Sequence, residues 1–531
     1  MQFNSRRSPV FARNGMVATS QPIAAMAGLK ILMEGGNAVD AAVASAAVLN
    51  VVEPESTGMG GDLFALVWDA NRKSVRALNA SGYSSSKSSI AEVKSHGHEY
   101  IPPQSPYAVT VPGTVSGWHT LITECGTMPF AKVLEPAIAY ARTGFAMTPI
   151  IGDAIDQAAP KLLCHPSGKE LLRDGRPAQS GEIVKFPELA NSLQAVADGG
   201  AEAFYKGDIA KNISSYIQSL GGWLTTEDLA SYTAEWVDPI QTNYRGIDCW
   251  ECPPNGQGLN ALMALNLLEG FNISELGFQS SDTIHYLVES MRLAFADGLH
   301  FIADPNQTIV PVARMLSKEH STARRSLISR DHAMDRITYD PHLRDADTVY
   351  VSCVDGNGNA CSLINSLFHS FGSGLVAPGT GIALQNRGIS FSLDPDHPNC
   401  LAPRKRPFHT IIPAIATKNG DLWLSYGVMG GLQQAQGHLQ VISNMVDFGL
   451  DPQSALDARR FNVNLDGTTT LEQDFSPDLI EELKSRGHLI THESGRAGVL
   501  FGGGQVIARD PASGVLTAGS DPRKDGCAIG W

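Results

Sequence analysis

The hydrophobic positions in the first part of the chain repeat at the spacing of α-helices. Residues 22–33 are mostly apolar, follow Ser20 as a candidate N-cap and stop before Gly35 and Gly36. This is the pattern of one complete helix. The next segment predicts a second helix, because its apolar side chains recur at helical spacing: Val39, Val43, Ala46 and Ala47.

More helices and a strand are predicted farther along. A run of small residues, 56–62, leads into the strand-like segment 63–68. Helical spacing returns at 130–143 and 186–220. It is strongest after Asp282, where the apolar positions are Ile284, Leu287, Val288, Met291 and Phe295. The first two thirds therefore predict helices with interspersed strands.

The pattern in the last third is that of β-strands. Residues 348–354 and 360–367 flank the turn sequence Asp-Gly-Asn-Gly-Asn at 355–359, which is a strong signal for a β-hairpin. Similar strand–turn–strand patterns span 411–426 and 504–518. Together with the helices, they predict an α+β sandwich in which helices cover a mainly antiparallel sheet.

Composition and charge narrow the class of protein. The chain has 531 residues, of which 43% are hydrophobic and 18% charged, as in ordinary globular proteins. Acidic residues outnumber basic ones by 54 to 40, and the net charge is −14. A phosphate backbone would be repelled by this charge, and we expect no nucleic-acid partner.

Targeting and membrane segments are not predicted. The first residues contain arginines but no apolar region typical of a signal peptide. The most apolar stretch, 38–52, contains Asp40 and is too short to cross a bilayer. The eight cysteines are scattered, which favours reduced thiols in a cytoplasmic protein without membrane association.

Metal and redox motifs are weak. Cys249 and Cys252 form a lone CxxC pair without a second pair to complete a zinc site. His96, His98 and Glu99 lie in a polar, loop-like stretch. We therefore expect neither a metal nor another cofactor.

One residue pattern points to chemistry. Thr348 is the first residue of a predicted strand and follows the polar sequence Arg344-Asp-Ala-Asp347. A glycine pair, Gly430-Gly431, comes after a later strand. On residue type alone, Thr348 is best explained as a β-branched residue that begins a strand.

Several ordered motifs resemble the γ-glutamyltransferase family, from about Gly15 to the C-terminus. Those in the last third are Asp347-Thr348 with the following hairpin to Asn359, Phe371-Gly-Ser-Gly374, Arg406-Pro407, Gly430-Gly431 and Ser520-Asp-Pro-Arg523. Those in the first part are Gly35-Gly-Asn-Ala-Val-Asp40, Gly58-Met-Gly-Gly61 and Val111-Pro-Gly-Thr-Val-Ser-Gly117.

The resemblance implies a fold and a maturation step. The family belongs to the N-terminal nucleophile hydrolases, with a four-layer αββα sandwich. The Thr348 hydroxyl would attack the carbonyl of Asp347 and cut the chain into a large subunit, 1–347, and a small subunit, 348–531. The two would form a heterodimer within one αββα unit, and the pairing of two such heterodimers stays open.

The same resemblance assigns catalytic roles. A threonine hydroxyl is a weak nucleophile and needs a base. The freed α-amine of Thr348, with a pKa of roughly 7.7–8.0, suits that role near neutral pH. Gly430 and Gly431 would donate backbone N–H groups to the oxyanion; their alternative reading is a tight turn after a strand. Ser366 keeps a hydroxyl that is expected to bond to Thr348.

Several positions depart from the γ-glutamyl pattern. Phe368 stands where the family has an asparagine, and Ser81 where an arginine binds the α-carboxylate. Ser390 replaces the aspartate that binds the α-amino group, and two serines that hold the carboxylate align with His409 and Thr410. The lid segment, 391–406, is shortened. A buried ammonium without its carboxylate partner is poorly held, which argues against a γ-glutamyl substrate.

Arg387 is an added charge where the transferases have an uncharged residue. An arginine there would hold a carboxylate, or else pair with a neighbouring loop. Phe368 would favour a small or flat substrate, or else pack in the core. Within the family, the sequence is most similar to the branch that includes oxamate amidohydrolase, which converts oxamate to oxalate and ammonia in purine-nitrogen salvage. We therefore expect a small carboxylate-bearing amide as substrate.

Three alternatives stay open at this stage. The chain is a γ-glutamyl hydrolase or transpeptidase with altered pocket residues, a cephalosporin-acylase-like amidase, or a non-catalytic binding member of the fold. The shortened lid favours the acylase, whereas Phe368 argues against it. The presence of Thr348, Ser366 and both glycines argues against a binding protein.

Overall fold

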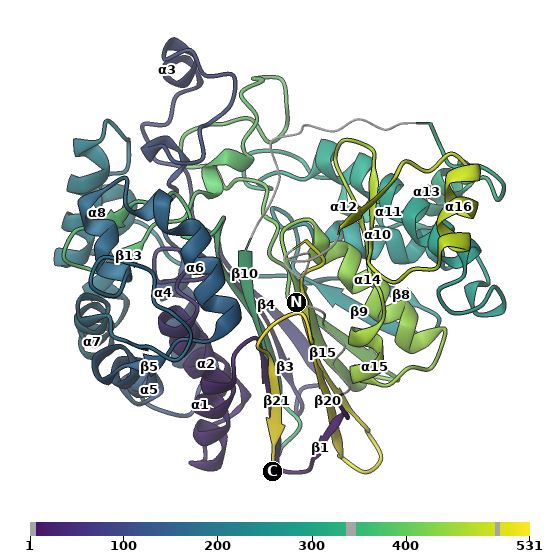
Figure 1. The fold of residues 1–531 in the computed structure, drawn as a ribbon, viewed down its shortest axis with the longest axis horizontal. Coiled ribbons are helices and arrows are strands. Elements are labelled where there is room, and N and C mark those ends of the chain that lie inside the picture. The colour runs from purple at the N-terminus through teal and green to yellow at the C-terminus, as the bar shows by residue number, and fades with distance from the viewer. Residues whose placement is uncertain (1–6, 336–346, 494–499) are drawn as a thin grey trace.

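Two antiparallel sheets of seven strands each lie face to face at the centre of the molecule (Figure 1). The computed structural model describes residues 7–335, 347–493 and 500–531, and of Asp347 only the backbone. Sheet 1 has the order β21 (Cys527–Gly530), β2 (Gly15–Thr19), β10 (Asp347–Asp355), β11 (Ala360–Phe368), β3 (Asp62–Asp69), β4 (Ser74–Ala80) and β7 (Glu235–Val237). Sheet 2 has the order β1 (Val10–Ala12), β20 (Leu516–Ser520), β19 (Gly503–Arg509), β15 (Asp421–Met429), β14 (Ala414–Lys418), β9 (Ile247–Glu251) and β8 (Ile240–Tyr244).

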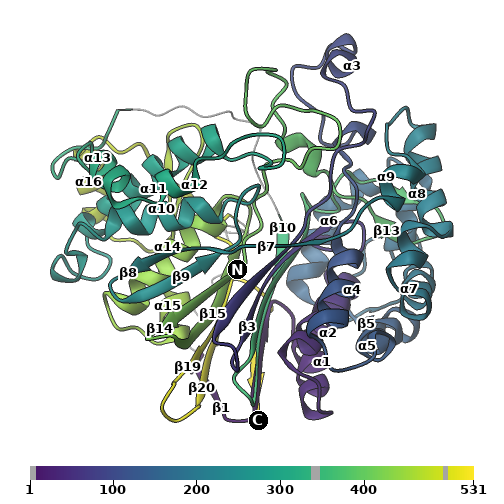
Figure 2. The same cartoon turned by 180° about the vertical axis from the view of Figure 1, so that it is seen from behind.

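Helices cover the outer face of each sheet, as both views show (Figures 1 and 2). Sheet 1 packs against α1 (Pro22–Met33), α2 (Ala38–Val52) and α4 (Thr114–Cys125), and α5 (Phe130–Thr143) and α7 (Pro187–Tyr205) pack outside them. Sheet 2 packs against α10 (Gly258–Leu268), α14 (Gln433–Val446) and α15 (Pro452–Asp457), with α11 (Ser281–Phe301) outside. This is the predicted four-layer αββα sandwich.

The remaining elements lie at the periphery of these layers. They are the helices α3 (Ile90–Ser95), α6 (Pro149–Leu162), α8 (Asp208–Ser219), α9 (Thr226–Ala230), α12 (Val312–Met315), α13 (Lys318–Arg325) and α16 (Pro477–Ser485), and the short strands β5 (Phe145–Ala146), β6 (Ile183–Val184), β12 (Val376–Ala377), β13 (Ile382–Ala383), β16 (Phe461–Val463), β17 (Thr469–Glu472) and β18 (Ile490–Glu493). None of the helices in the described ranges is long and apolar enough to cross a membrane.

The alternation of side chains along β10 and β11 decides which residues face the space between the sheets. In β10, Val349 and Val351 lie in the core under the helices, whereas Tyr350 lies in the core between the sheets. In β11, Leu363 faces the helices and Ile364 faces the other sheet. Because strand side chains alternate, even-numbered positions of both strands, Thr348 and Ser366 among them, point toward sheet 2.

The predicted hairpins are present, and one helix cap differs from the prediction. β10–β11, β14–β15 and β19–β20 are antiparallel neighbours. Helix α1 has the predicted range, but its N-cap is Gln21, whose side chain accepts hydrogen bonds from the N–H groups of Ile23 and Ala24. Ser20 was predicted for this role and instead donates to Glu53 Oε1 at 2.5 Å. A hydrogen bond from a hydroxyl to a carboxylate is stronger than one between a hydroxyl and a backbone N–H. The Ser20 side chain therefore pairs with Glu53.

Candidate active site

Thr348 lies buried between the two sheets at the start of β10. Its side chain is 1% exposed, and its register with β11 shifts between Asp347 and Val349, as at a β-bulge. Such a bulge re-aims a side chain at the edge of regular pairing. Thr348 Oγ1 donates to Ser366 Oγ at 3.1 Å, and Gln434 Nε2 approaches Thr348 Oγ1 at 3.5 Å. The predicted cleavage site falls partly outside the described residues, because the side chain of Asp347 and residues 336–346 are not among them.

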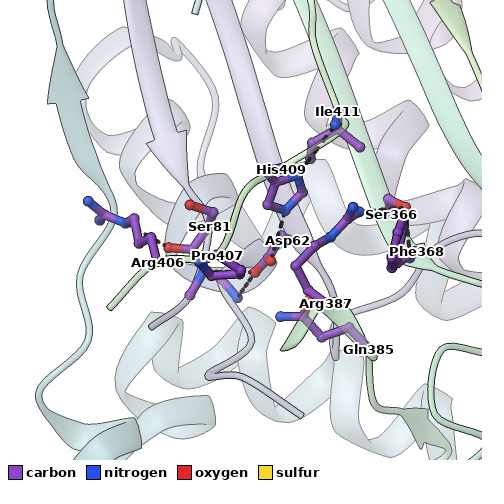
Figure 3. Close-up of polar contacts among 12 residues, drawn as sticks. Asp62, Ser81, Ser366, Phe368, Gln385, Arg387, Arg406, Pro407, His409 and Ile411 are labelled. Atoms are coloured by element: carbon purple, nitrogen blue, oxygen red, sulfur yellow. Dashed lines mark hydrogen bonds and ion pairs between the residues drawn. The ribbon is translucent and has the colours of Figure 1, made fainter. Parts of the chain in front are cut away.

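Ser366 is fixed by its neighbours. Its Oγ accepts a hydrogen bond from the N–H of Phe368 at 2.8 Å, in addition to that from Thr348. Arg387 Nη2 also points at this oxygen, at 3.5 Å (Figure 3). The structure therefore brings together Thr348, Ser366, Phe368 and Arg387, as expected from the sequence.

Gly430 and Gly431 form the turn between β15 and α14. Their φ angles are 120° and 57°, and a Cβ on Gly430 would stand 3.0 Å from the Cα of Gly502. Their carbonyls accept hydrogen bonds from Gln433 N and Gln434 N, respectively. Within the part of the chain that the structure describes, no hydrogen bond engages either N–H. Both groups stand at the N-terminus of α14, where helix N–H groups and the helix dipole favour negative charge.

Two glutamines connect this turn to the nucleophile and to residues 409–412. Gln434 Oε1 accepts from the N–H of Ile412 at 2.9 Å while its Nε2 faces Thr348. Gln257 Nε2 donates to the carbonyls of Thr410, at 2.6 Å, and Gly431, at 2.8 Å. The turn, the nucleophile and the segment containing His409 and Thr410 are thus held in one hydrogen-bonded unit.

Arg387 is a fully buried cation beside the nucleophile. Its Nη1 donates to Thr410 Oγ1 at 2.8 Å, and the guanidinium lies 3.9 Å from the ring centroid of Phe368. Its Nε has no hydrogen-bond partner among the described residues. Burial lowers the pKa of Arg387 to about 9, and the charge of Asp62 opposes that shift. A buried guanidinium with an unused donor is suited to a carboxylate ligand.

Phe368 lies in a small core and also contacts Arg387. Its ring packs with Ile389, Phe391, Leu393 and Leu401 in a small core, while its face lies under Arg387. Three of those core residues come from the predicted lid segment, 391–406. The segment 391–406 is therefore part of the core that contains Phe368, whose ring lies against the Arg387 guanidinium.

Asp62 and His409 form a buried pair that the sequence did not single out. Asp62, the first residue of β3, accepts from His409 Nε2 at 3.0 Å on Oδ2, and from Gly82 N and Gly113 N on Oδ1. His409 Nδ1 accepts from Ile411 N at 3.3 Å, so the imidazole is the neutral tautomer with its proton on Nε2. Figure 3 shows the pair beside Arg387. An acidic residue directly after Gly60-Gly61 and before an apolar strand was the available signal.

Charges in this cluster influence one another. Burial raises the pKa of Asp62 to about 7, and the positive charge of Arg387 opposes the rise. Burial first, and then the charge of Arg387, hold the pKa of His409 well below its ordinary value. His409 therefore stays neutral, and Asp62 is the group that titrates near neutral pH.

Ser81 lies in a different hydrogen-bonded group. Its hydroxyl donates to Asn79 Oδ1 at 2.7 Å, and its carbonyl accepts from Arg406 Nε at 3.0 Å. In the described ranges, no hydrogen bond joins Ser81 to Thr348 or Arg387. The Ser390 hydroxyl is buried, without a partner among the described residues. No group of three or more His, Cys, Asp or Glu side chains able to hold a metal was found in the same ranges.

Comparison with known proteins gives one consistent result. The family model described as gamma-glutamyltranspeptidase matches residues 24–531. The chain is 36% identical to a glutathione hydrolase-like YwrD proenzyme from Bacillus subtilis, over 98% of this chain and 99% of that protein. It is 32% identical to an oxamate amidohydrolase proenzyme from Klebsiella pneumoniae, over 98% of each. The structure of a cephalosporin acylase from Bacillus halodurans is similar with a TM-score of 0.93 and 43% identity, covering 100% of this chain and 98% of that one.

Proposed function

Because the chain belongs to the gamma-glutamyltranspeptidase family, whose relatives are named as hydrolases, we propose that this amide hydrolase is a proenzyme that cuts itself between Asp347 and Thr348. Thr348 then hydrolyses a small amide that bears a carboxylate. The best candidate is oxamate, which would give oxalate and ammonia. The observation that carries the substrate class is the buried Arg387, whose Nη2 points at the hydroxyl that holds Thr348.

Self-cleavage would be an acyl shift at the start of β10. Thr348 Oγ attacks the carbonyl carbon of Asp347, the C–N bond breaks, and the nitrogen leaves as the free α-amine of Thr348. Water then hydrolyses the Asp347 ester. The hydrogen bond to Ser366 supports this step, because it orients the Thr348 hydroxyl before an amine is present to do so.

Turnover uses the amine made by cleavage. It takes the proton of the Thr348 hydroxyl as that oxygen attacks the substrate amide, and it returns a proton to the departing ammonia. The N–H groups of Gly430 and Gly431 stabilise the oxyanion, and it supports this role that neither has another partner among the described residues. Water then hydrolyses the acyl-enzyme ester, releasing the acid and restoring Thr348.

Substrate selection rests on Arg387 and Phe368. The guanidinium has an Nε–H that no described residue engages and that is suited to a carboxylate, and the Phe368 ring covers its face. No carboxylate stands at position 390 to bind an α-ammonium group, because that residue is Ser390. An acyl group with a carboxylate and no amino group fits this set of residues better than a γ-glutamyl group does.

A second candidate is an acylase that takes longer acyl chains. The 43% identity to a cephalosporin acylase over the whole chain favours it. Such a substrate would use the same nucleophile and the same arginine, and differ in the length between the scissile amide and the carboxylate. The two candidates are therefore distinguished by chain length.

The experiment is ammonia or amine release from a graded panel. The panel contains oxamate, the monoamides of longer dicarboxylic acids, a γ-glutamyl anilide and a cephalosporin side-chain amide. Highest kcat/KM for oxamate supports the first candidate, and highest kcat/KM for a longer chain supports the second. Preference for an uncharged amide would contradict the role of Arg387, and preference for the γ-glutamyl anilide would contradict the exclusion of an α-ammonium group that Ser390 implies.

The proposed enzyme is a heterodimer of the two chains and is located in the cytoplasm. The two chains stay together as a heterodimer, since sheet 1 alternates their strands: β10 of the small chain pairs with β2 of the large chain, and β11 pairs with β3. We place the enzyme in the cytoplasm, which agrees with eight cysteines that are all free thiols.

A further inference from the structure

The charge balance around Arg387 has a consequence for ligand binding. Arg387 is fully buried, and so are Asp62 and His409 beside it. His409 is neutral, since its Nδ1 accepts from Ile411 N and its Nε2 proton goes to Asp62. Without a bound anion, the guanidinium and the Asp62 carboxylate therefore neutralise each other. A substrate carboxylate would add one uncompensated negative charge among these buried side chains.

We infer that Asp62 is the exchangeable counter-ion of Arg387: it takes up a proton when a substrate carboxylate binds Arg387, so that an anionic amide binds without leaving the site charged. This inference rests on the proposed function and deepens it. In the free enzyme the pair is Arg387⁺ with Asp62⁻. In the complex it is Arg387⁺ with the substrate carboxylate, and Asp62 is a neutral acid whose proton comes from solvent.

The surroundings of Asp62 have a place for that proton. Asp62 Oδ1 already accepts from two backbone N–H groups, and Oδ2 accepts from His409. The side chain of Gln385 also interacts with the Asp62 carboxylate. That contact is a hydrogen bond donated by the Gln385 amide, which favours the ionised carboxylate. Gln385 Oε1 is buried and has no hydrogen-bond partner among the described residues, so turning the amide over would present an acceptor to a protonated Asp62.

The other ionisable side chains near Asp62 do not titrate in the same pH range. Tyr205 of α7 and Tyr232, which follows α9, interact with Asp62, and burial raises the pKa of each phenol above its ordinary value. His409 is held neutral. The remaining candidate is the α-amine of Thr348 in the cut enzyme. Asp62, with a pKa of about 7, is in contrast poised for proton uptake under neutral conditions.

The test is binding of oxalate to the cut enzyme by calorimetry between pH 6.5 and 9, in buffers of different ionisation enthalpy. Oxalate carries two negative charges and Asp62 compensates one of them, so the wild type should take up about one proton more per oxalate than D62N at pH 8.5, and its Kd should rise by about tenfold per pH unit above pH 7.5. The variant D62N should lose that uptake and bind oxalate at least about tenfold more tightly than the wild type at pH 8.5. A gain in affinity is not a result that misfolding produces.

Two comparisons isolate Asp62. D69N, at the other end of β3, removes the same charge outside the site and should behave as the wild type. The α-amine of Thr348 contributes equally to all three proteins, so the difference between D62N and the wild type belongs to Asp62. Infrared difference spectra of the wild type give a reading that needs no variant: oxalate binding at pH 8.5 should produce the C=O band of a buried carboxylic acid.

The outcomes separate this inference from the proposed function. Oxalate binding with equal proton uptake in D62N and wild type, or without the acid band, overturns the role of Asp62 and leaves the carboxylate site intact. No oxalate binding at any pH, together with no hydrolysis of carboxylate-bearing amides, overturns both.

Discussion

At the scale of single residues, a small set of buried polar side chains surrounds Thr348. Ser366 orients the hydroxyl, Gln434 approaches it, and Arg387 supplies the only positive side chain that the described residues bring to the Ser366 hydroxyl. Asp62 balances the charge of that arginine, and His409 donates a hydrogen bond to Asp62. Each of these side chains is buried and has its own role, so replacing any one of them is expected to change activity in a distinct and measurable way.

Replacing Arg387 by lysine tests its role as carboxylate ligand. Lysine keeps the charge but loses the planar pair of donors, so KM for a carboxylate-bearing amide should rise about tenfold to a hundredfold while kcat changes little. Steady-state kinetics measure this, with the exposed Arg404→Lys as control. An unchanged KM would assign Arg387 to loop packing instead.

The shifted pKa of Asp62 predicts a pH dependence of stability. The folded protein holds this proton up to a pKa of about 7, whereas the unfolded chain releases it near pH 4. Asp62 therefore costs stability as the pH rises from about 4 to about 7, and no further above that. The Tm of D62N relative to wild type should increase over this interval and then level off. A difference that is constant with pH would contradict the shift.

At the scale of elements, the site is built where strands end. Thr348 is the second residue of β10, Ser366 lies near the end of β11, and Asp62 begins β3, so three neighbouring strands of sheet 1 place these polar residues at the same end of the sheet. Sheet 2 contributes the turn after β15. The glycines there permit the positive φ angles of that turn and the close approach of Gly502.

The two ends of β15 provide a matched test of the proposed oxyanion turn. Gly420 and Gly430 both have positive φ, but a Cβ on Gly420 meets nothing within 4 Å, whereas one on Gly430 meets Gly502. Both alanine variants should lose about 1 kcal/mol or more of stability from the backbone. Only Gly430→Ala should also lower kcat, by about a hundredfold or more. Equal kcat values in the two variants would contradict the oxyanion role.

The helices and strands could be predicted from the sequence better than the contacts between side chains could. The β10–β11 hairpin followed from its Asp-Gly and Asn-Gly turn, and α2 from its apolar spacing, because these signals are local in sequence. The resemblance of ordered motifs gave Thr348 and its neighbours. The pairing of Asp62 with His409 joins positions 347 residues apart, and no local pattern records such a contact. The same is true of Gln257, whose two carbonyl partners come from separate segments.

At the scale of the whole molecule, cleavage would divide the sequence without dividing the fold. Sheet 1 places β2 of the large chain between β21 and β10 of the small chain, and sheet 2 places β14 of the small chain beside β9 of the large one. Separating the chains would expose these strand edges and both sheet cores. The cut protein should therefore remain one particle until it unfolds.

Native mass spectrometry checks this expectation. The cut enzyme should have the mass of both chains together under native conditions and show two separate masses only after denaturation. A matched measurement on uncut Thr348→Ala should give the same native mass per unit. Spontaneous separation of the cut chains at neutral pH would contradict the interleaved sheets.

The central claim is that Thr348 becomes an N-terminal nucleophile, and the denatured mass of freshly purified protein tests it most directly. We expect two masses that correspond to residues 1–347 and 348–531, and a single uncut mass for Thr348→Ala. A wild-type chain that stays whole after prolonged incubation would lack the proposed base, and would contradict the account at its first step.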